Sequence, residues 1–112
     1  MSDFSAIDAP WWRDGRIDYG ALVRLDDAAI EAALADLAWE RDGDALVKTV
    51  RRGDFSGALA YVNAVGALAE ALGHHPDVAI SWETVTLRLW THARGGITEA
   101  DLALARRIDA LD

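Results

Sequence analysis

The three histidines of this 112-residue chain lie within 19 consecutive positions, and their side chains are the best suited to chemistry. His74 and His75 are adjacent, His92 follows, and Glu70 and Asp101 flank the group. Because histidine titrates near neutrality, it is the usual carrier of protons at pH 7. The segment from Glu70 to Asp101 therefore predicts a site of proton transfer. The residues alone leave an alternative open, in which the histidines are polar turn residues and Asp101 only caps a helix.

Two other kinds of site fit these residues less well. Three histidines and a carboxylate can bind zinc, but adjacent His74 and His75 lack the i, i+4 spacing of a helical ligand pair, so we expect no metal. The chain has no cysteine, and no serine stands in a strand-turn-helix elbow, so nucleophilic catalysis is not expected either.

Composition sets the class of protein and excludes several partners. A chain of 112 residues, 52% hydrophobic and 27% charged, fits one globular domain. The net charge of −8 disfavours binding to nucleic acid, and we interpret the basic cluster Lys48, Arg51 and Arg52 as one polar strand face. We see no signal peptide and no apolar run approaching the roughly 20 residues of a membrane helix, so no membrane partner is expected and the cytoplasm is the expected location.

Three helices are predicted to position the histidines. Asp26 suits the start of the first, Gly73 suits the end of the second, and Thr98 with Asp101 forms a capping-box-like start for the third. Apolar residues recur at spacings of three and four within each. The predicted ranges are 26–38, 55–72 and 99–110.

Strand patterns lie between the predicted helices. One hairpin is predicted around Asp42-Gly43, and a second joins a short strand at 78–80 to an alternating strand at 84–92. The order indicates an α+β fold, a four-stranded antiparallel sheet with three helices packed on one face. An open edge of such a sheet invites a second subunit.

Residues 1–24 are an N-terminal extension of uncertain structure before the domain at 25–112. Asp14-Gly15 indicates a small hairpin within it. Trp11 and Trp12 are costly to expose, but the sequence does not say whether this domain, a second subunit or a partner covers them.

Several motifs together resemble the pterin-4a-carbinolamine dehydratase family over about residues 25–111. They are Glu70-x-x-x-His74-His75-Pro76-Asp77, an aromatic residue at Trp82, Thr91-His92, Gly95-Gly96-x-Thr98-x-x-Asp101 and Leu102-x-x-Ala105. Upstream, Leu25 to Ile30 resembles the first helix of the family. The segment Leu37-Ala-Trp39 resembles its Leu-Pro-Gly-Trp turn, with one alanine in place of Pro-Gly.

The resemblance implies a metal-free dehydratase that needs no cofactor, because the pterin is its substrate. Such an enzyme converts 4a-hydroxytetrahydropterin, formed by aromatic amino-acid hydroxylases, into quinonoid dihydropterin. By the same resemblance, His74 and His92 form the acid/base pair and His75 binds the pterin. Glu70 orients a histidine or holds substrate, and Asp101 supports the site. Pro76, Asp77 and Trp82 are further candidates for substrate binding or support.

The resemblance also implies dimers that pair into tetramers. The competing function is a non-catalytic binding or assembly-chaperone protein on the same fold, as in relatives that resemble Rubisco assembly factors. Loss of the histidines would favour that function, and this chain retains all three.

Overall fold

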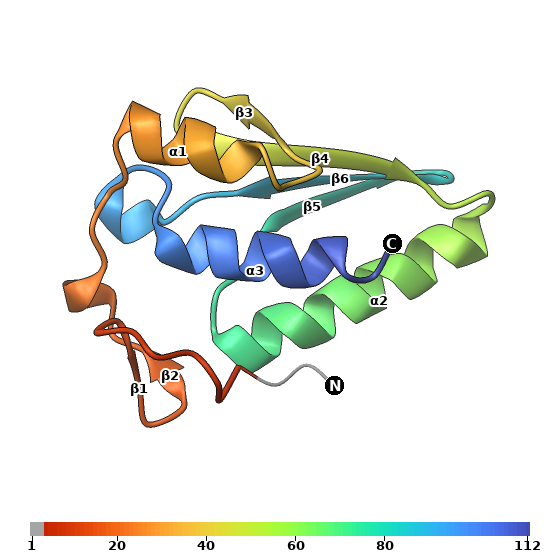
Figure 1. The fold of residues 1–112 in the computed structure, drawn as a ribbon. Coiled ribbons are helices and arrows are strands. Elements are labelled where there is room, and N and C mark those ends of the chain that lie inside the picture. Colours follow the sequence, from red (N-terminus) through yellow and green to blue (C-terminus); the bar gives the residue numbers. More distant parts are fainter. Residues whose placement is uncertain (1–3) are drawn as a thin grey trace.

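A four-stranded antiparallel sheet with the strand order β3-β4-β6-β5 forms one layer of the computed structural model, which describes residues 4–112 (Figure 1). Its strands are β3 (Glu40–Asp42), β4 (Ala45–Arg51), β5 (Asp77–Ser81) and β6 (Thr84–Leu89). The alternating side chains of β6 behave as predicted, since Val85, Leu87 and Leu89 are buried between less buried polar neighbours. The α+β class and the antiparallel pairing are thus confirmed.

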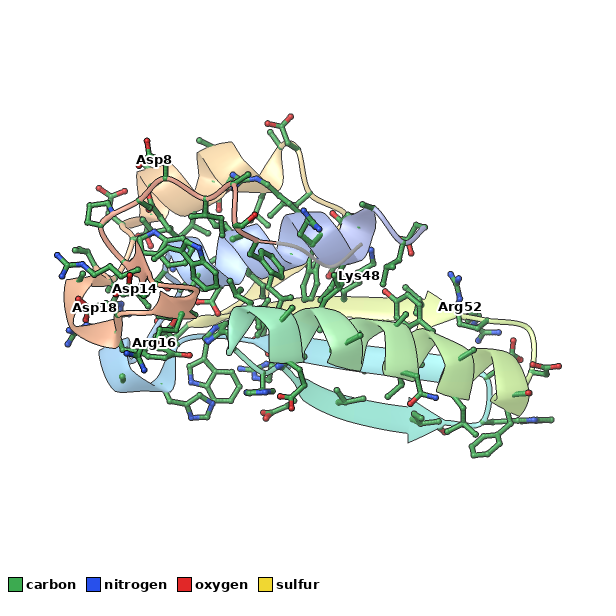
Figure 2. All side chains as sticks on the ribbon, turned by 90° about the horizontal axis from the view of Figure 1, so that it is seen from below. Asp8, Asp14, Arg16, Asp18, Lys48 and Arg52 are labelled. Atoms are coloured by element: carbon green, nitrogen blue, oxygen red, sulfur yellow. The ribbon has the colours of Figure 1, made fainter. Side chains whose placement is uncertain are left out.

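Three helices accompany the sheet, namely α1 (Asp27–Leu34), α2 (Phe55–Leu72) and α3 (Glu99–Asp109). Asp26, Asp54 and Thr98 accept hydrogen bonds from backbone N–H groups as their N-caps. In Figure 2, α3 lies between α1 and α2, and Figure 1 shows α2 and α3 below the sheet. Buried side chains from all three helices and from the sheet join in one hydrophobic core.

The first helix is shorter than predicted, because α1 ends at Leu34 rather than near residue 38. The cause lies on α3, where the Asp109 carboxylate accepts hydrogen bonds from the Ala38 backbone N–H and from the Trp39 indole at 2.8 and 2.9 Å. These contacts hold the chain after α1 in a turn that leads directly into β3. The sequence pattern could not show that a carboxylate about 70 residues away would compete with the helix.

The sequence predicted no membrane helix, yet the 18 residues of α2 are long and apolar enough to cross a membrane, by length and composition alone. It is nevertheless amphipathic in its packing. Tyr61, Val65 and Leu72 are buried in the core, whereas Asn63 and Glu70 are exposed. We interpret α2 as a core helix of the domain.

The N-terminal extension forms its own two-stranded sheet, which the single predicted sheet did not include. Strands β1 (Trp12–Arg13) and β2 (Arg16–Ile17) pair across Asp14 and Gly15, whose φ angles are both positive at 53° and 76°, as a type I′ turn requires. The 3₁₀ helix η1 (Tyr19–Ala21) follows.

The extension is packed on the domain rather than separate from it. Phe4, Trp11 and Leu22 are buried in the main core, and the Trp11 indole donates a hydrogen bond to Glu99 at 2.8 Å. The surface that covers Trp11 therefore belongs to this same chain.

The predicted polar strand face is wrong for Lys48, which is only 5% exposed. Lys48 lies opposite Leu87 in the sheet register, so its side chain points to the helices, where it reaches Asp109 and Asp112 at 2.5 Å each. Figure 2 shows Lys48 near the C-terminal end of α3 and Arg52 beyond the end of β4. The three basic residues do not form one patch.

Candidate active site

A cleft of about 320 Å³ lies where three parts of the chain meet, and all three histidines line it. One wall comes from η1 of the extension, one from the loop between α2 and β5, and one from the segment after β6 and the 3₁₀ helix η2 (His92–Arg94). The lining residues are Tyr19, His74, His75, Trp90, His92 and Ala93. The volume is within the range of small-molecule sites.

The turn after α2 allows adjacent histidines to share this cleft. Gly73 ends the helix in the left-handed region at φ 76°, and the His74 backbone N–H still bonds to Ala69, so the chain bends sharply between helix and strand. His74 is 5% exposed, whereas His75 is exposed. After this bend, both rings line the cleft.

Asp101 is the centre of a buried hydrogen-bond network that fixes His74. Its Oδ1 lies 2.5 Å from His74 Nε2, and its Oδ2 accepts from the Thr91 hydroxyl at 2.8 Å and from the Thr98 backbone N–H at 2.9 Å. The bond to Thr98 completes the capping box of α3. One carboxylate therefore both caps α3 and holds the His74 ring.

Tyr19 approaches the other nitrogen of His74. Its hydroxyl lies 3.0 Å from His74 Nδ1 and 2.8 Å from the Gly73 carbonyl oxygen. Burial raises the pKa of Tyr19 above its usual 10.0, and the negative charge of Asp101 raises it further, so the phenol is protonated at neutral pH. Both ring nitrogens of His74 consequently have hydrogen-bond partners within the protein.

Glu70 meets His75 and not His74, although His74 is the residue four positions after it in the sequence. The distance from its Oε2 to His75 Nε2 is 2.5 Å. The reason is that α2 ends at Leu72, so the helical relation does not extend to His74. Both side chains of this pair are exposed, which makes the contact an orienting one of small energetic value.

His92 forms the rim of the cleft together with Trp90. Their rings are stacked, with centroids 4.1 Å apart and planes inclined by 21°. His92 is exposed, unlike His74. The stacked pair offers a flat aromatic surface beside the two other histidines.

None of the five predicted support residues lines the cleft, although Glu70 and Asp101 contact histidines that do. Pro76 lies in the turn after His75, and Asp77 is exposed at the first position of β5. Trp82 is 77% exposed in the β5–β6 turn, at the opposite end of β6 from His92, and the six residues of β6 alone span about 20 Å. The assignment of Trp82 to the site is therefore not supported within one chain.

Sequence reasoning missed three lining residues and two hydroxyls behind them. Trp90 and Ala93 flank His92 and could have been inferred from that proximity, but nothing in the sequence connects Tyr19 with His74. The Thr91 and Thr98 hydroxyls bond to each other at 2.8 Å, and Asp101 accepts from the Thr91 hydroxyl and from the Thr98 backbone N–H. Over residues 4–112, the structure contains no group of three histidine or acidic side chains arranged to hold a metal ion.

Comparison with known proteins agrees with this geometry. The sequence model of the family described as Pterin 4 alpha carbinolamine dehydratase matches residues 23–111. The chain belongs to this family. A protein of Thermomicrobium roseum, provisionally named a pterin-4-alpha-carbinolamine dehydratase, is 50% identical over 91 residues, which cover 80% of this chain and 98% of that protein. A similarly named protein of Nocardia farcinica is 49% identical over 88 residues, which cover 78% and 93%.

Two solved structures share the fold. A crystal structure from Brucella melitensis, described as a transcriptional coactivator/pterin dehydratase, has a TM-score of 0.75 and 31% identity, and the match covers 79% of this chain and 97% of that one. A pterin dehydratase-like protein described as a RuBisCO assembly factor in the alpha-carboxysome has a TM-score of 0.54 and 29% identity, with coverage of 67% and 87%.

Proposed function

We propose that the protein catalyses the dehydration of 4a-hydroxytetrahydropterin to quinonoid dihydropterin. The observation that carries this proposal is the convergence of His74, His75 and His92 on one cleft, with His74 anchored to the buried Asp101. Membership of the dehydratase family supports the same reaction.

The reaction requires proton transfer at two positions of the pterin. The C4a–O bond breaks as the hydroxyl leaves as water, and N5 loses a proton as the C4a–N5 double bond forms. An acid must protonate the hydroxyl and a base must accept the N5 proton, and histidines perform both roles near neutral pH. We assign the acid role to His74 and the base role to His92, which is exposed on another wall of the cleft and can release its proton to solvent.

The remaining residues bind and orient. His75, held by Glu70, contacts the polar edge of the pterin, and the stacked pair of Trp90 and His92 borders the cleft with an aromatic surface that suits a flat bicyclic ring. Asp101 fixes the orientation of the His74 ring and the nitrogen that carries its proton.

The mechanism that we propose uses neither a metal nor a cofactor. His74 has no nitrogen free for a metal, since Asp101 and Tyr19 occupy both, and His75 bonds to Glu70 through Nε2. The substrate itself carries the reacting groups. The physiological role that follows is the recycling of pterin in the cytoplasm for an aromatic amino-acid hydroxylase, with a separate reductase acting on the product.

We further propose a homodimer or homotetramer. Strand β5 is an edge of the four-stranded sheet, and Val78 on it is 43% exposed. On α2, Phe55 and Leu59 are 50% and 42% exposed. An edge strand and an apolar helix face of this kind suit contacts between copies of the chain.

A stopped-flow assay with enzymatically generated carbinolamine tests the proposed reaction directly. Alanine at His74 or at His92 should lower kcat by as much as 10²–10⁴-fold, measured above the uncatalysed rate, whereas alanine at His75 should act mainly on KM. The double variant of His74 and His92 should be little worse than the poorer single variant, because groups that act as a unit are not additive. Absence of any acceleration by the wild-type protein would instead favour the non-catalytic binding function.

A further inference from the structure

Among the residues that line the cleft in the described part of the chain, Tyr19 lies outside the family match, which begins at residue 23. It stands in η1, within the extension, yet its hydroxyl reaches the buried histidine. A role carried over from the family does not include this residue, so its function has to be inferred from its contacts.

The hydrogen bonds of His74 leave one route for a proton between the ring and the cleft. Nε2 faces Asp101, which is completely buried and bonded to Thr91 and Thr98, so a proton on that side has no path to substrate. Nδ1 is the only other nitrogen of the ring, and the Tyr19 hydroxyl lies against it at 3.0 Å. A proton that leaves the ring through Nδ1 therefore meets Tyr19 first.

The Tyr19 hydroxyl suits both protonation states of His74. When the ring is neutral with its hydrogen on Nε2, the hydroxyl donates to Nδ1. When the ring is protonated at both nitrogens, Nδ1–H donates to the phenolic oxygen, and the hydroxyl hydrogen turns away from Nδ1, toward the Gly73 carbonyl at 2.8 Å or toward the cleft.

We propose that Tyr19 passes the proton between His74 and the pterin, as the terminal member of a chain Asp101–His74–Tyr19. This inference rests on the proposed dehydration. In the forward step, the Tyr19 O–H bond gives its proton to the 4a-hydroxyl as the C4a–O bond breaks and water leaves. The phenolic oxygen takes the Nδ1 proton of His74 at the same time, so Tyr19 ends as a neutral phenol and His74 as a neutral imidazole. The N5 proton passes to His92.

The structure holds Tyr19 firmly in this place. Arg94 in η2 donates hydrogen bonds to the carbonyl oxygens of Tyr19 and Gly20 at 3.1 Å and to that of Leu22 at 2.9 Å. The Asp18 carboxylate accepts from the Gly20 N–H at the start of η1. The Arg94 side chain thus ties the backbone of the extension to the same short helix that carries His92.

The test removes one oxygen atom and keeps the ring. In the stopped-flow assay, Tyr19→Phe should lower kcat on the order of 10²-fold with little change in KM, and the double variant Tyr19→Phe/His74→Ala should be no slower than His74→Ala. Tyr61→Phe is the matched control, since this tyrosine lies on α2 and its buried hydroxyl has no hydrogen-bond partner within residues 4–112. It should retain wild-type kcat.

A second variant gives a readout that a structural role would not change and does not depend on the folding of Tyr19→Phe. Fluorotyrosine incorporated at position 19 keeps the hydroxyl and lowers its pKa, so loss of kcat at alkaline pH should begin at lower pH than in the wild type. The relay would be overturned by any of four results: wild-type kcat in Tyr19→Phe, an effect of that variant on KM alone, multiplicative losses in the double variant, or an unchanged pH profile with fluorotyrosine. In each of these cases, an active wild-type protein would leave the proposed function intact. An inactive wild-type protein would overturn both.

Discussion

Replacement of Asp101 by asparagine separates its two roles, because the amide keeps the shape of the carboxylate and loses its charge. The amide oxygen of this variant can still accept the hydrogen bonds from Thr91 and the Thr98 N–H, which preserves the start of α3. The NH₂ group then faces His74 Nε2, which must turn from donor to acceptor. The ring can do so by moving its hydrogen to Nδ1, where the Tyr19 oxygen accepts it while the hydroxyl donates to Gly73.

The expected cost to stability is moderate, and the expected cost to catalysis is large. Exchange of a charge-assisted hydrogen bond for a neutral one, with a changed tautomer, should cost about 2 kcal/mol. An unfolding entropy of about 2.1 cal/mol/K per residue over 112 residues converts this into a fall in Tm of about 8 °C. The value of kcat should fall on the order of 10²–10⁴-fold, because His74 is locked in a neutral tautomer without its counter-charge.

The measurement combines stopped-flow kinetics with thermal unfolding, and Asp109→Asn is its matched control. Asp109 also lies on α3 and accepts three hydrogen bonds, from Ala38, Trp39 and Lys48, but it does not line the cleft. Asp109→Asn should lower Tm and leave kcat unchanged. If Asp101→Asn loses Tm yet retains wild-type kcat, the carboxylate only caps the helix and the assignment of His74 is refuted.

Four further predictions concern stability, assembly and metal content. Burial lowers the pKa of Lys48, but its hydrogen bonds to Asp109 and Asp112 outweigh this effect and raise the pKa above 10.5. The charged lysine therefore stabilises the folded state fully below pH 10.5, and this stabilisation is lost as the pH rises through the pKa of Lys48 in the folded protein. Lys48→Met should therefore cost about 1–3 kcal/mol at pH 7 in chemical denaturation and show a shallower alkaline loss than the wild type, whereas equal slopes would contradict the assignment. Gly73→Ala should cost about 1–2 kcal/mol through its positive φ, and Gly73→Asn should cost less; equal stabilities would contradict this. Light scattering should give a mass of two or four chains, and a 12.1 kDa species would exclude the oligomer. Elemental analysis should find no stoichiometric metal, and activity lost to a chelator would contradict that expectation.

The fold was largely predictable because its signals are local. The limits of α2, the hairpin around Gly43 and the capping box at Thr98 depend on residues within a few positions of one another, and all are present in the structure. The errors arose where distant groups decide the outcome. Asp109 ends α1 early, and the sheet register turns Lys48 inward, and neither effect is visible in a window of neighbouring residues.

The same difference between local signals and contacts of distant residues applies to the candidate site. The histidines could be recognised from their clustering, but their hydrogen-bond partners could not. Gly73 ends α2 and redirects the chain, so the residues that contact each histidine do not follow from helical spacing. Glu70 meets His75, and His74 meets Asp101, 27 positions further on. Tyr19 lies 55 positions before His74, in a segment without helical periodicity or a family motif.

The double bonding of Asp101 affects how relatives of this protein should be classified. A carboxylate that both starts α3 and holds His74 stabilises the fold whether or not the protein turns over a pterin. A descendant that had given up chemistry for assembly or binding would still be selected to keep it. The presence of this aspartate in a relative is therefore uninformative about activity. His92 is exposed at the rim of the cleft and takes no part in the buried network of Asp101, so it is the position at which an enzyme can be told from a scaffold.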